Sequence, residues 1–241
     1  MKSSIKIFLT LIIIFSIIEL RGFSQSNENQ KNKSHNKLSQ KEMDEGWELL
    51  FNGKEITEWR YYDSVSRKIT GWTVSNGHLH KPSGIKAGNI MTNKTYDNYI
   101  FSWEWRLEDG GNNGVKYFIT EERKAALGHE YQMIDDKKVK DPFYSNGSFY
   151  LIVKPIDGKP NLPMGSWNHS QIKVKGNNVE HWLNGIKILS YICGSKEVMD
   201  RVPKTKFKNV LKFGEKIKGH ILLTDHNDAC WYRNIKIKEL P

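Results

Sequence analysis

Short runs in which hydrophobic and polar residues alternate fill the chain from position 46 to its end at position 241. The runs at 99–107 and 171–175 alternate with a period of two, which is the period of a half-buried strand. Asn-Gly pairs at 76–77 and 184–185 separate such runs, and this pair is the strongest short signal for a hairpin turn. The pattern therefore predicts many short strands joined by tight turns.

Helical patterns are scarce in the same part of the chain. Residues 120–127 and 195–201 are the only candidates, each of about two turns. No repeat of fixed period and no second domain can be recognised. We therefore expect one all-β domain over 46–241, an antiparallel two-sheet sandwich.

The alternation also assigns side chains to the two faces of a strand. In the run at 99–107, Trp103 and Trp105 share one face, which we expect to belong to the core. Glu104 and Arg106 project from the opposite face of the same strand. This strand should therefore lie between a hydrophobic core and a polar surface.

A second polar pair comes from the run at 130–135, where Glu130 and Gln132 project together. If the two strands are neighbours on a curved sheet, Glu130 and Gln132 join Glu104 and Arg106 on one concave polar surface. The alternative is a solvated face on which these groups only form salt bridges. The first arrangement would make the surface a candidate ligand site.

The first residues have the layout of a signal peptide, which we assign to 1–25. Lys2 and Lys6 precede an apolar run at 7–18, which is shorter than the roughly 20 residues needed to span a bilayer. We therefore expect an exported protein, periplasmic or secreted, with no stable membrane anchor. Residues 26–45 are rich in Asn, Gln, Lys and Ser, and we expect them to form a flexible polar leader.

Charge and composition exclude some classes of partner. The formal net charge is +10, and removal of residues 1–25 lowers it to +8. A basic protein can bind nucleic acid, but export and the scattering of lysines among acids argue against that partner. Aromatic residues make up 12% of the chain, which favours strands and stacking surfaces.

The two cysteines and the acidic residues say little about metals. Cys193 and Cys230 are too few for a cysteine-based zinc site. An oxidising compartment would permit a disulfide between them, and two buried thiols are the alternative. Loops with Asp and Asn would suit a calcium ion, but no spacing indicates one, so we expect no cofactor.

Seven short stretches, taken in order, carry a resemblance to a known family. Together they resemble the 3-keto-disaccharide hydrolase family over about 46–240. The stretches are GWELLFNGK at 46–54, NNGV at 112–115, GHEYQMIDD at 128–136, WN at 167–168, HWLNG at 181–185, TDH at 224–226 and YRNIKI at 232–237.

The resemblance implies a fold, a substrate and a partner. It implies a concanavalin A-like jelly roll of the lectin and glucanase type. It also implies cleavage of glycosides whose sugar a partner oxidoreductase has first oxidised to a 3-ketone. The carbohydrate substrate would therefore be a 3-keto-glycoside.

The resemblance also places individual residues in matching motif positions, without giving their roles. These residues are Glu130, Gln132, Asp135, Trp182, Asp225, His226 and Arg233. The chain departs from the family pattern near the same motifs. Leu151 stands where an acid is common, Thr224 where Gln is common and Asn227 where Gly is usual.

The chemistry of such a substrate defines what the site must supply. A ketone at C3 acidifies the hydrogen at C2, so a base can remove it, the oxygen at C1 can leave by elimination, and water can then add. Histidine side chains titrate near neutrality, which makes His226, with Asp225 beside it, the first candidate for proton transfer. Glu130 is the alternative base.

Other residues could bind the substrate or have structural roles only. Lys116, Arg106 or Arg233 could stabilise the enolate or bind hydroxyl groups. Asp135 could instead cap a turn, and Trp182, before an Asn-Gly turn, could instead be a packing residue. His226 could likewise be a structural imidazole.

Three rival functions remain at this point. A glucanase that retains configuration places acids two residues apart on one strand, and here Gln132 follows Glu130, which disfavours direct two-carboxylate catalysis. A non-catalytic, lectin-like carbohydrate-binding module would have the same fold. A basic protein that binds anionic polysaccharide would show binding that depends strongly on salt and no turnover.

Overall fold

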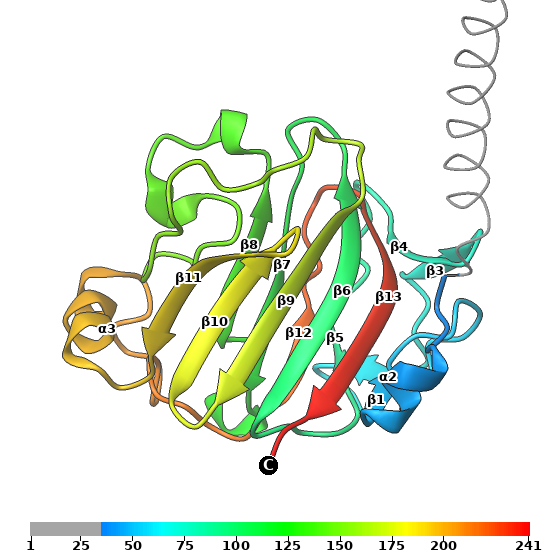
Figure 1. The fold of residues 1–241 in the computed structure, drawn as a ribbon, viewed down its shortest axis with the longest axis horizontal. Helices are drawn as coiled ribbons and strands as arrows, with labels where there is room; N and C mark the ends of the chain where they lie inside the picture. Colours follow the sequence, from blue (N-terminus) through cyan, green and yellow to red (C-terminus); the bar gives the residue numbers. More distant parts are fainter. Residues whose placement is uncertain (1–34) are drawn as a thin grey trace, which may run out of the picture. The chain divides into compact units, whose positions relative to one another are not determined.

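Two antiparallel sheets form the domain in the computed structural model, which describes residues 35–241. Sheet A has eight strands in the order β11-β10-β9-β6-β13-β4-β3, with β1 also paired to β13 (Figure 1). Its strands are β1 (Trp47–Leu49), β3 (Thr73–Ser75), β4 (His78–Lys81), β6 (Tyr99–Leu107), β9 (Asn168–Lys175), β10 (Asn178–Leu183), β11 (Ile186–Ile192) and β13 (Cys230–Glu239).

Sheet B has five strands in the order β2-β5-β12-β7-β8. Its strands are β2 (Trp59–Tyr61), β5 (Ile90–Thr92), β12 (His220–Leu223), β7 (Asn112–Ile119) and β8 (His129–Ile134). Every pairing in both sheets is antiparallel, which is the arrangement that short hairpin turns permit. The predicted all-β, two-sheet jelly-roll class is confirmed.

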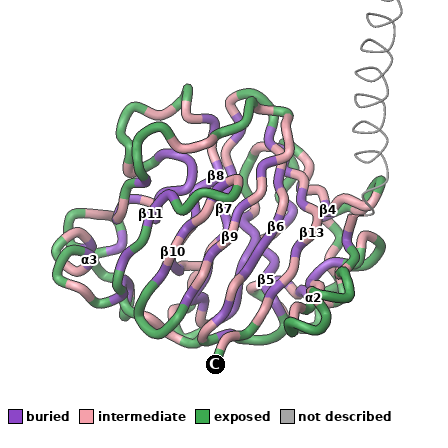
Figure 2. Tube along the Cα trace, viewed as in Figure 1, coloured by how far each residue is buried: buried purple, intermediate pink, exposed green. Residues whose placement is uncertain are grey.

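The core lies between the two sheets, where the buried parts of the trace concentrate (Figure 2). Trp103 and Trp105 of β6 are fully buried there, as the alternation predicts. From sheet B, Tyr131 reaches the same core, and its ring meets Trp103 edge to face at 5.1 Å between centroids. These large aromatic rings fill the space between the sheets and remove much apolar area from water.

The helices are short and lie outside the sheets. They are α2 (Gln40–Asp44), α3 (Lys196–Arg201) and the 3-10 turns η1 (Glu121–Arg123), η2 (Asp136–Lys138), η3 (Pro142–Tyr144) and η4 (Val202–Lys204). The helix predicted at 195–201 corresponds to α3, which Ser195 caps. The helix predicted at 120–127 is wrong, because Lys124 adopts a left-handed conformation with φ of 52° and ends η1 after three residues.

The folded domain begins before position 46. The leader predicted over 26–45 is wrong for its last ten residues, because α2 is held by a capping box between Ser39 and Glu42. Asn36 is buried, and its amide group and backbone exchange hydrogen bonds of 2.6 and 2.8 Å with Asn234. The polar composition of residues 36–45 indicates neither feature, because a capping box and an amide pair need no apolar residue.

The predicted signal peptide at 1–25 and the first part of the predicted leader lie outside the described residues. Within residues 35–241, no helix is long and apolar enough to cross a membrane.

Cys193 and Cys230 are both buried and unpaired, so the disulfide alternative does not hold. Cys193 follows β11 and Cys230 begins β13, and three strands of sheet A separate β11 from β13. Since neighbouring strands are about 4.8 Å apart, the two sulfur atoms are far beyond bonding distance. Burial raises the pKa of the Cys193 thiol to about 12 and also raises that of Cys230.

Candidate functional site

The two predicted polar pairs lie on opposite outer faces of the sandwich. Glu104 and Arg106 project from β6 in sheet A, away from the core that Trp105 enters. Glu130 and Gln132 project from β8 in sheet B, also away from the core. The single concave surface predicted for all four residues is therefore wrong. We call the outer surface of sheet A face A and that of sheet B face B.

Face B brings an acid, a cation and an aromatic residue into one transverse row. Lys116 of β7 is the register partner of Glu130 in β8. On the other side, the N–H of Tyr150 donates to the carbonyl oxygen of Glu130 at 3.1 Å, and Phe149 forms a bridge with Tyr131. Because Phe149 and Tyr131 both enter the core, Tyr150 and Glu130 share face B.

The carboxylate of Glu130 has no partner in the described part of the chain. No hydrogen bond or ion pair joins it to any residue within 35–241, and the side chain is only partly exposed. Its Oε1 lies over Gly114, where a Cβ atom would collide with it. Glycine at 114 therefore leaves room for the Glu130 carboxylate, which is in a position to accept a proton from a ligand.

A chain of polar contacts connects Gln132 with His226. Nε2 of Gln132 donates to Oδ1 of Asn112 at 2.6 Å. Nδ2 of Asn112 lies 3.3 Å from Nε2 of His226, and the backbone N–H of Asn112 donates to Asp228 at 2.9 Å. Asp228 Oδ2 is 3.8 Å from Nδ1 of His226. The amide of Asn112 therefore donates to Nε2, which places the imidazole proton on Nδ1, toward Asp228.

Asp225 does not orient His226. Its Oδ2 accepts the N–H of Gly88 at 2.8 Å, and its Oδ1 lies 3.4 Å from Nζ of Lys81, whose side chain is fully buried. Asp225 thus balances a buried cation between the sheets, while Asp228 takes the place beside His226. Of the predicted catalytic residues, Glu130 and His226 share face B, and Asp225 lies behind them.

Thr224, which stands where the resemblance leads us to expect Gln, has a structural role. Its hydroxyl donates to Oδ1 of Asn113 at 2.7 Å, and the hydroxyl of Tyr232 donates to the same atom at 3.1 Å. Both contacts are buried. The pair of Asn113 and Thr224 therefore fixes β7 against β12 directly beneath the polar chain of face B.

Four of the predicted substrate-binding residues lie on face A. There, Glu104 accepts hydrogen bonds from Arg233 at 2.6 Å and from Asn234 at 2.7 Å. Burial alone would raise the pKa of Glu104, but these two donors outweigh burial and lower it. Trp182 also lies on this face, where its indole N–H donates to Glu180 at 3.0 Å. The fourth, Arg106, stacks against tryptophan rings.

Asp135 caps a turn, which the sequence analysis gave as the alternative to substrate binding. The residue is buried, and its carboxylate accepts the N–H of Lys137 at 3.1 Å and of Gly110 at 3.0 Å. It caps η2 and holds the turn before β7 against the end of β8. Both carboxylate oxygens therefore hold the local turn together.

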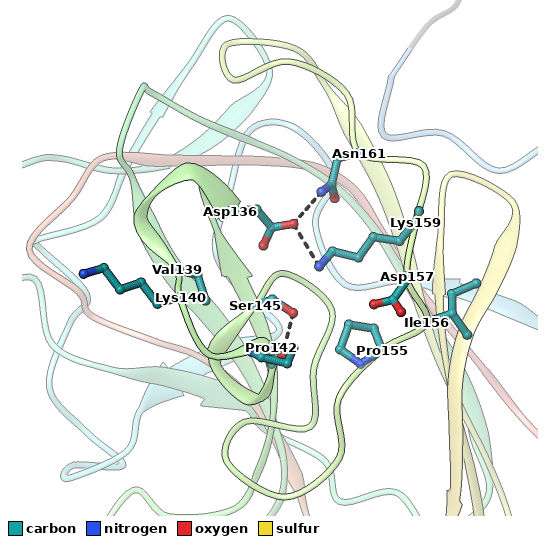
Figure 3. A pocket seen from close by; sticks show the side chains of 11 residues that line it. Asp136, Val139, Lys140, Pro142, Ser145, Pro155, Ile156, Asp157, Lys159 and Asn161 are labelled. Atoms are coloured by element: carbon teal, nitrogen blue, oxygen red, sulfur yellow. Dashed lines mark hydrogen bonds and ion pairs between the residues drawn. The ribbon is translucent and has the colours of Figure 1, made fainter.

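A separate cavity of about 300 Å³ opens between the segments 136–145 and 155–161 (Figure 3). Asp136 projects into it and accepts from Lys159 at 2.8 Å and from Asn161 at 2.6 Å. No predicted site residue lines the cavity, and of its two acids, Asp136 and Asp157, the first is already paired. Within residues 35–241, no group of three or more His, Cys, Asp or Glu side chains is arranged to hold a metal ion.

Sequence reasoning missed three residues of face B. Asn112 belongs to a quoted motif, but its role depends on β7 lying between β8 and β12. Asp228 lies in the turn after His226, and spacing in the sequence does not show in which direction the side chain of a turn residue points. Tyr150 belongs to a loop with no alternating pattern, so the sequence does not indicate that this residue pairs with β8.

Comparison with known proteins decides the family. Residues 46–238 match the 3-keto-alpha-glucoside-1,2-lyase-like domain. The chain belongs to this family. All the residues of face B described above lie inside the matched range, whereas α2 and Asn36 precede it.

Members of this lyase-like family are similar to this chain along most of their length. A 3-keto-disaccharide hydrolase of Bacteroides thetaiotaomicron is 28% identical over 231 residues, which cover 81% of this chain and 79% of the relative. A crystal structure from Parabacteroides distasonis, provisionally named a glycosyl hydrolase, is 32% identical with a TM-score of 0.78 and covers 86% of this chain and 100% of its own. A second such structure from that species is 26% identical, with a TM-score of 0.62, and covers 80% and 99%.

Proposed function

We propose that this carbohydrate hydrolase cleaves the glycosidic bond of 3-keto-glycosides by proton abstraction at C2, elimination and rehydration. Membership of the lyase-like family supports a glycosidase-like enzyme, and the name of the Bacteroides thetaiotaomicron relative supports a 3-keto sugar as substrate. The observation that carries the proposal is the unpartnered carboxylate of Glu130 beside Lys116 and Tyr150 on face B.

The reaction requires three changes in bonding. A base removes the hydrogen at C2, and the electrons of that bond form an enolate on the C3 oxygen. The enolate collapses to restore the C3 ketone, which forms a C1–C2 double bond and expels the glycosidic oxygen with a proton from an acid. Water then adds at C1, and a proton returns to C2.

Glu130 is the base in this proposal. Its carboxylate needs no rearrangement to reach a ligand, because no protein donor competes for its oxygens. Lys116 lies next to it and supplies the cation for the enolate oxygen; one of its ammonium protons bonds the carbonyl oxygen of Ala126 at 3.2 Å and fixes its direction. Tyr150 supplies an aromatic wall for the sugar ring on the other side.

His226 serves the leaving group and the water. Its side chain is 46% exposed, so substrate and solvent both reach it. Asn112 and Asp228 fix the orientation of the ring from two sides. Nδ1–H of His226, which at 3.8 Å from Asp228 is not hydrogen-bonded to it, donates the proton to the leaving oxygen, and Nδ1 takes one back from the attacking water.

Release of an aglycone from a 3-keto-glucoside tests the activity. The purified protein should release nitrophenol from p-nitrophenyl 3-keto-glucoside and leave the parent glucoside, which lacks the ketone, intact. Glu130→Gln should remove turnover but keep binding. Binding of the keto sugar by the wild-type protein without turnover would instead establish the lectin-like alternative.

Isotopes test the elimination step separately from the overall reaction. Deuterium at C2 of the substrate should slow kcat, and product formed in heavy water should carry deuterium at C2. Direct hydrolysis at C1 would leave the hydrogen at C2 in place, and that result would contradict the mechanism even if the aglycone were released.

We also propose export and supply of the substrate by another enzyme. The basic residues and the apolar run at 7–18 support export, and a sugar oxidoreductase must form the C3 ketone, because the proposed reaction consumes it. Cell fractionation should recover the protein outside the cytoplasm and shorter than 241 residues at its N-terminus. Recovery of the full chain from the cytoplasm would contradict export.

A further inference from the structure

Face A carries a transverse row of aromatic and basic side chains across four strands. In the register of sheet A, His80 of β4 pairs with Trp231 of β13, and Trp231 pairs with Arg106 of β6. Trp105, the neighbour of Arg106, pairs with Asn168 at the start of β9, which brings Trp167 to the end of the row. All four side chains of the row are partly exposed.

Arg106 contacts two indole rings. Its guanidinium carbon lies 4.5 Å from the ring centroid of Trp231 and 5.3 Å from that of Trp167, whose ring also meets the guanidinium of Arg233 at 4.0 Å. The far face of Trp231 is covered by His80, which stacks on it at 4.6 Å with an angle of 5° between the planes. Contacts with aromatic faces fix the plane of a guanidinium and leave its N–H groups at the edge.

The N–H donors of Arg106 have no hydrogen-bond acceptor in the described part of the chain. Among residues 35–241, no hydrogen bond and no ion pair reaches its guanidinium. The neighbouring carboxylate of Glu104 is already engaged by Arg233 and Asn234. Glu108 lies beyond the row at the end of β6, and it is exposed, so solvent screens its charge. A fixed cation without a counterion therefore faces outward.

We propose that Arg106, Trp167 and Trp231 form a second carbohydrate-binding site, on face A, which takes the carboxylate of a uronic acid-containing glycan. A guanidinium whose plane is fixed binds a planar carboxylate through two parallel hydrogen bonds. The exposed edges of the two tryptophans flank that carboxylate with apolar surface for the sugar ring. This inference goes beyond the proposed function, because it involves no residue of face B.

The position of the row separates the second site from the site of the proposed reaction. Arg106 and Glu130 project from different sheets, with the aromatic core between them. A sugar unit bound on face A is therefore not the unit cleaved at Glu130. The second site would hold the protein on an acidic polysaccharide while face B remains open.

Titration with galacturonic acid trisaccharide tests the proposal in the purified protein. A neutral galactose trisaccharide is the control for charge, and a sulfated trisaccharide distinguishes a carboxylate from a sulfate ester. We expect binding of the uronate only, and at least tenfold weaker binding for Arg106→Gln, because a charged bidentate contact is lost. Arg106→Lys, which keeps the charge but not the fork, should fall between the two.

Two further variants make the result specific. Lys173→Gln removes another cation from face A, in β9, and should bind the uronate as the wild type does. Glu130→Gln should also bind it unchanged, whatever the outcome of the turnover experiment. Equal binding by Arg106→Gln with an unchanged melting temperature, tighter binding of the sulfated or neutral sugar, or absence of uronate binding by the wild type would each overturn the proposal.

Discussion

Face A and face B each present a glutamate, Glu104 from the central strand β6 of sheet A and Glu130 from β8 at the end of sheet B, and the two glutamates have opposite surroundings. Glu104 on face A accepts short hydrogen bonds from Arg233 and Asn234. The carboxylate of Glu130 on face B accepts none from residues 35–241, although Lys116 is its neighbour in the sheet. The same alternation of polar and aromatic residues therefore produces one acid that stabilises the fold and one that is available to a ligand.

The difference shows how available charge is arranged in a sandwich of this kind. On face A the second arginine, Arg106, is the group without a counterion, whereas on face B it is the acid. Face A thus presents an arginine without a counterion among paired or stacked neighbours, and face B presents an acid whose neighbour Lys116 donates to a carbonyl oxygen instead. An unpaired ionisable group on a rigid strand is a stronger indication of function than the number of charges around it.

Replacing the free acid should have the largest effect. Glu130→Gln keeps the size of the side chain but removes the base, so we expect kcat on a 3-keto-glucoside to fall about a thousandfold, or ~4 kcal/mol of barrier. The matched control is Glu180→Gln on face A, where kcat should stay within twofold. Retention of a tenth or more of the activity by Glu130→Gln would assign the base to another residue.

A hydrogen-bonded network through the core joins the two sheets. Its histidines are buried and neutral, unlike the charged groups of face A and face B. His129 and Tyr117 come from sheet B, and His181 and Tyr191 come from sheet A. All the contacts are between 2.7 and 3.1 Å. The donors follow one direction, from Gly214 through His129, Tyr191, Tyr117 and His181 to Gly147.

Acid should weaken the domain through this network. Burial lowers the pKa of His181 to about 4, from an ordinary value of 6.5. The unfolded chain therefore binds a proton that the folded chain does not, so stability is complete above pH 6.5 and falls as the pH drops toward 4. His181 alone should cost about 3 kcal/mol over that interval, and His129, whose pKa is lowered by burial too, adds to it.

Urea denaturation at pH 7.5 and pH 4.5 measures this loss. His181→Phe should be less stable than the wild type at pH 7.5, because Tyr117 and the carbonyl of Gly147 lose a partner. Its further loss between the two pH values should be smaller than that of the wild type. An equal loss in both proteins would show that the acid sensitivity arises elsewhere.

The sequence predicts most of the fold, because alternation and turn chemistry are local. The burial of Trp103 and Trp105, the antiparallel sheets and α3 all follow from such signals. The early start of the domain did not follow. A capping box at Ser39 and the amide pair of Asn36 with Asn234 stabilise a polar segment that composition alone marks as flexible.

The site could be predicted only in part, because alternation gives the face of a strand and not the sheet to which the strand belongs. Glu104 and Glu130 have the same local pattern, yet β6 and β8 belong to different sheets. The direction of a turn is equally hidden. Asp225 is adjacent to His226 in the chain but faces Lys81, whereas Asp228 reaches the imidazole.

Replacing the cation beside Glu130 should have an intermediate effect. Lys116→Gln removes the charge that stabilises the enolate oxygen, so we expect kcat to fall about a hundredfold, or ~2.7 kcal/mol. Lys116→Arg should recover part of the activity. The steady-state rate with a 3-keto-glucoside measures both variants, and an unchanged kcat in Lys116→Gln would place the enolate oxygen away from this residue.

Replacing the acid beside His226 should have the smallest effect. The variant tests the charge of Asp228 separately from the shape of the turn. In Asp228→Asn, the amide oxygen can still accept the N–H of Asn112, so the turn keeps its shape, but the negative charge 3.8 Å from Nδ1 of His226 disappears. A partly exposed charge contributes little, so we expect kcat to fall about fivefold, or ~1 kcal/mol, with KM unchanged. A rise in KM alone would mean that Asp228 contacts the substrate. A loss as large as that of Glu130→Gln would mean that the charge on His226, and not the free carboxylate of face B, limits the reaction.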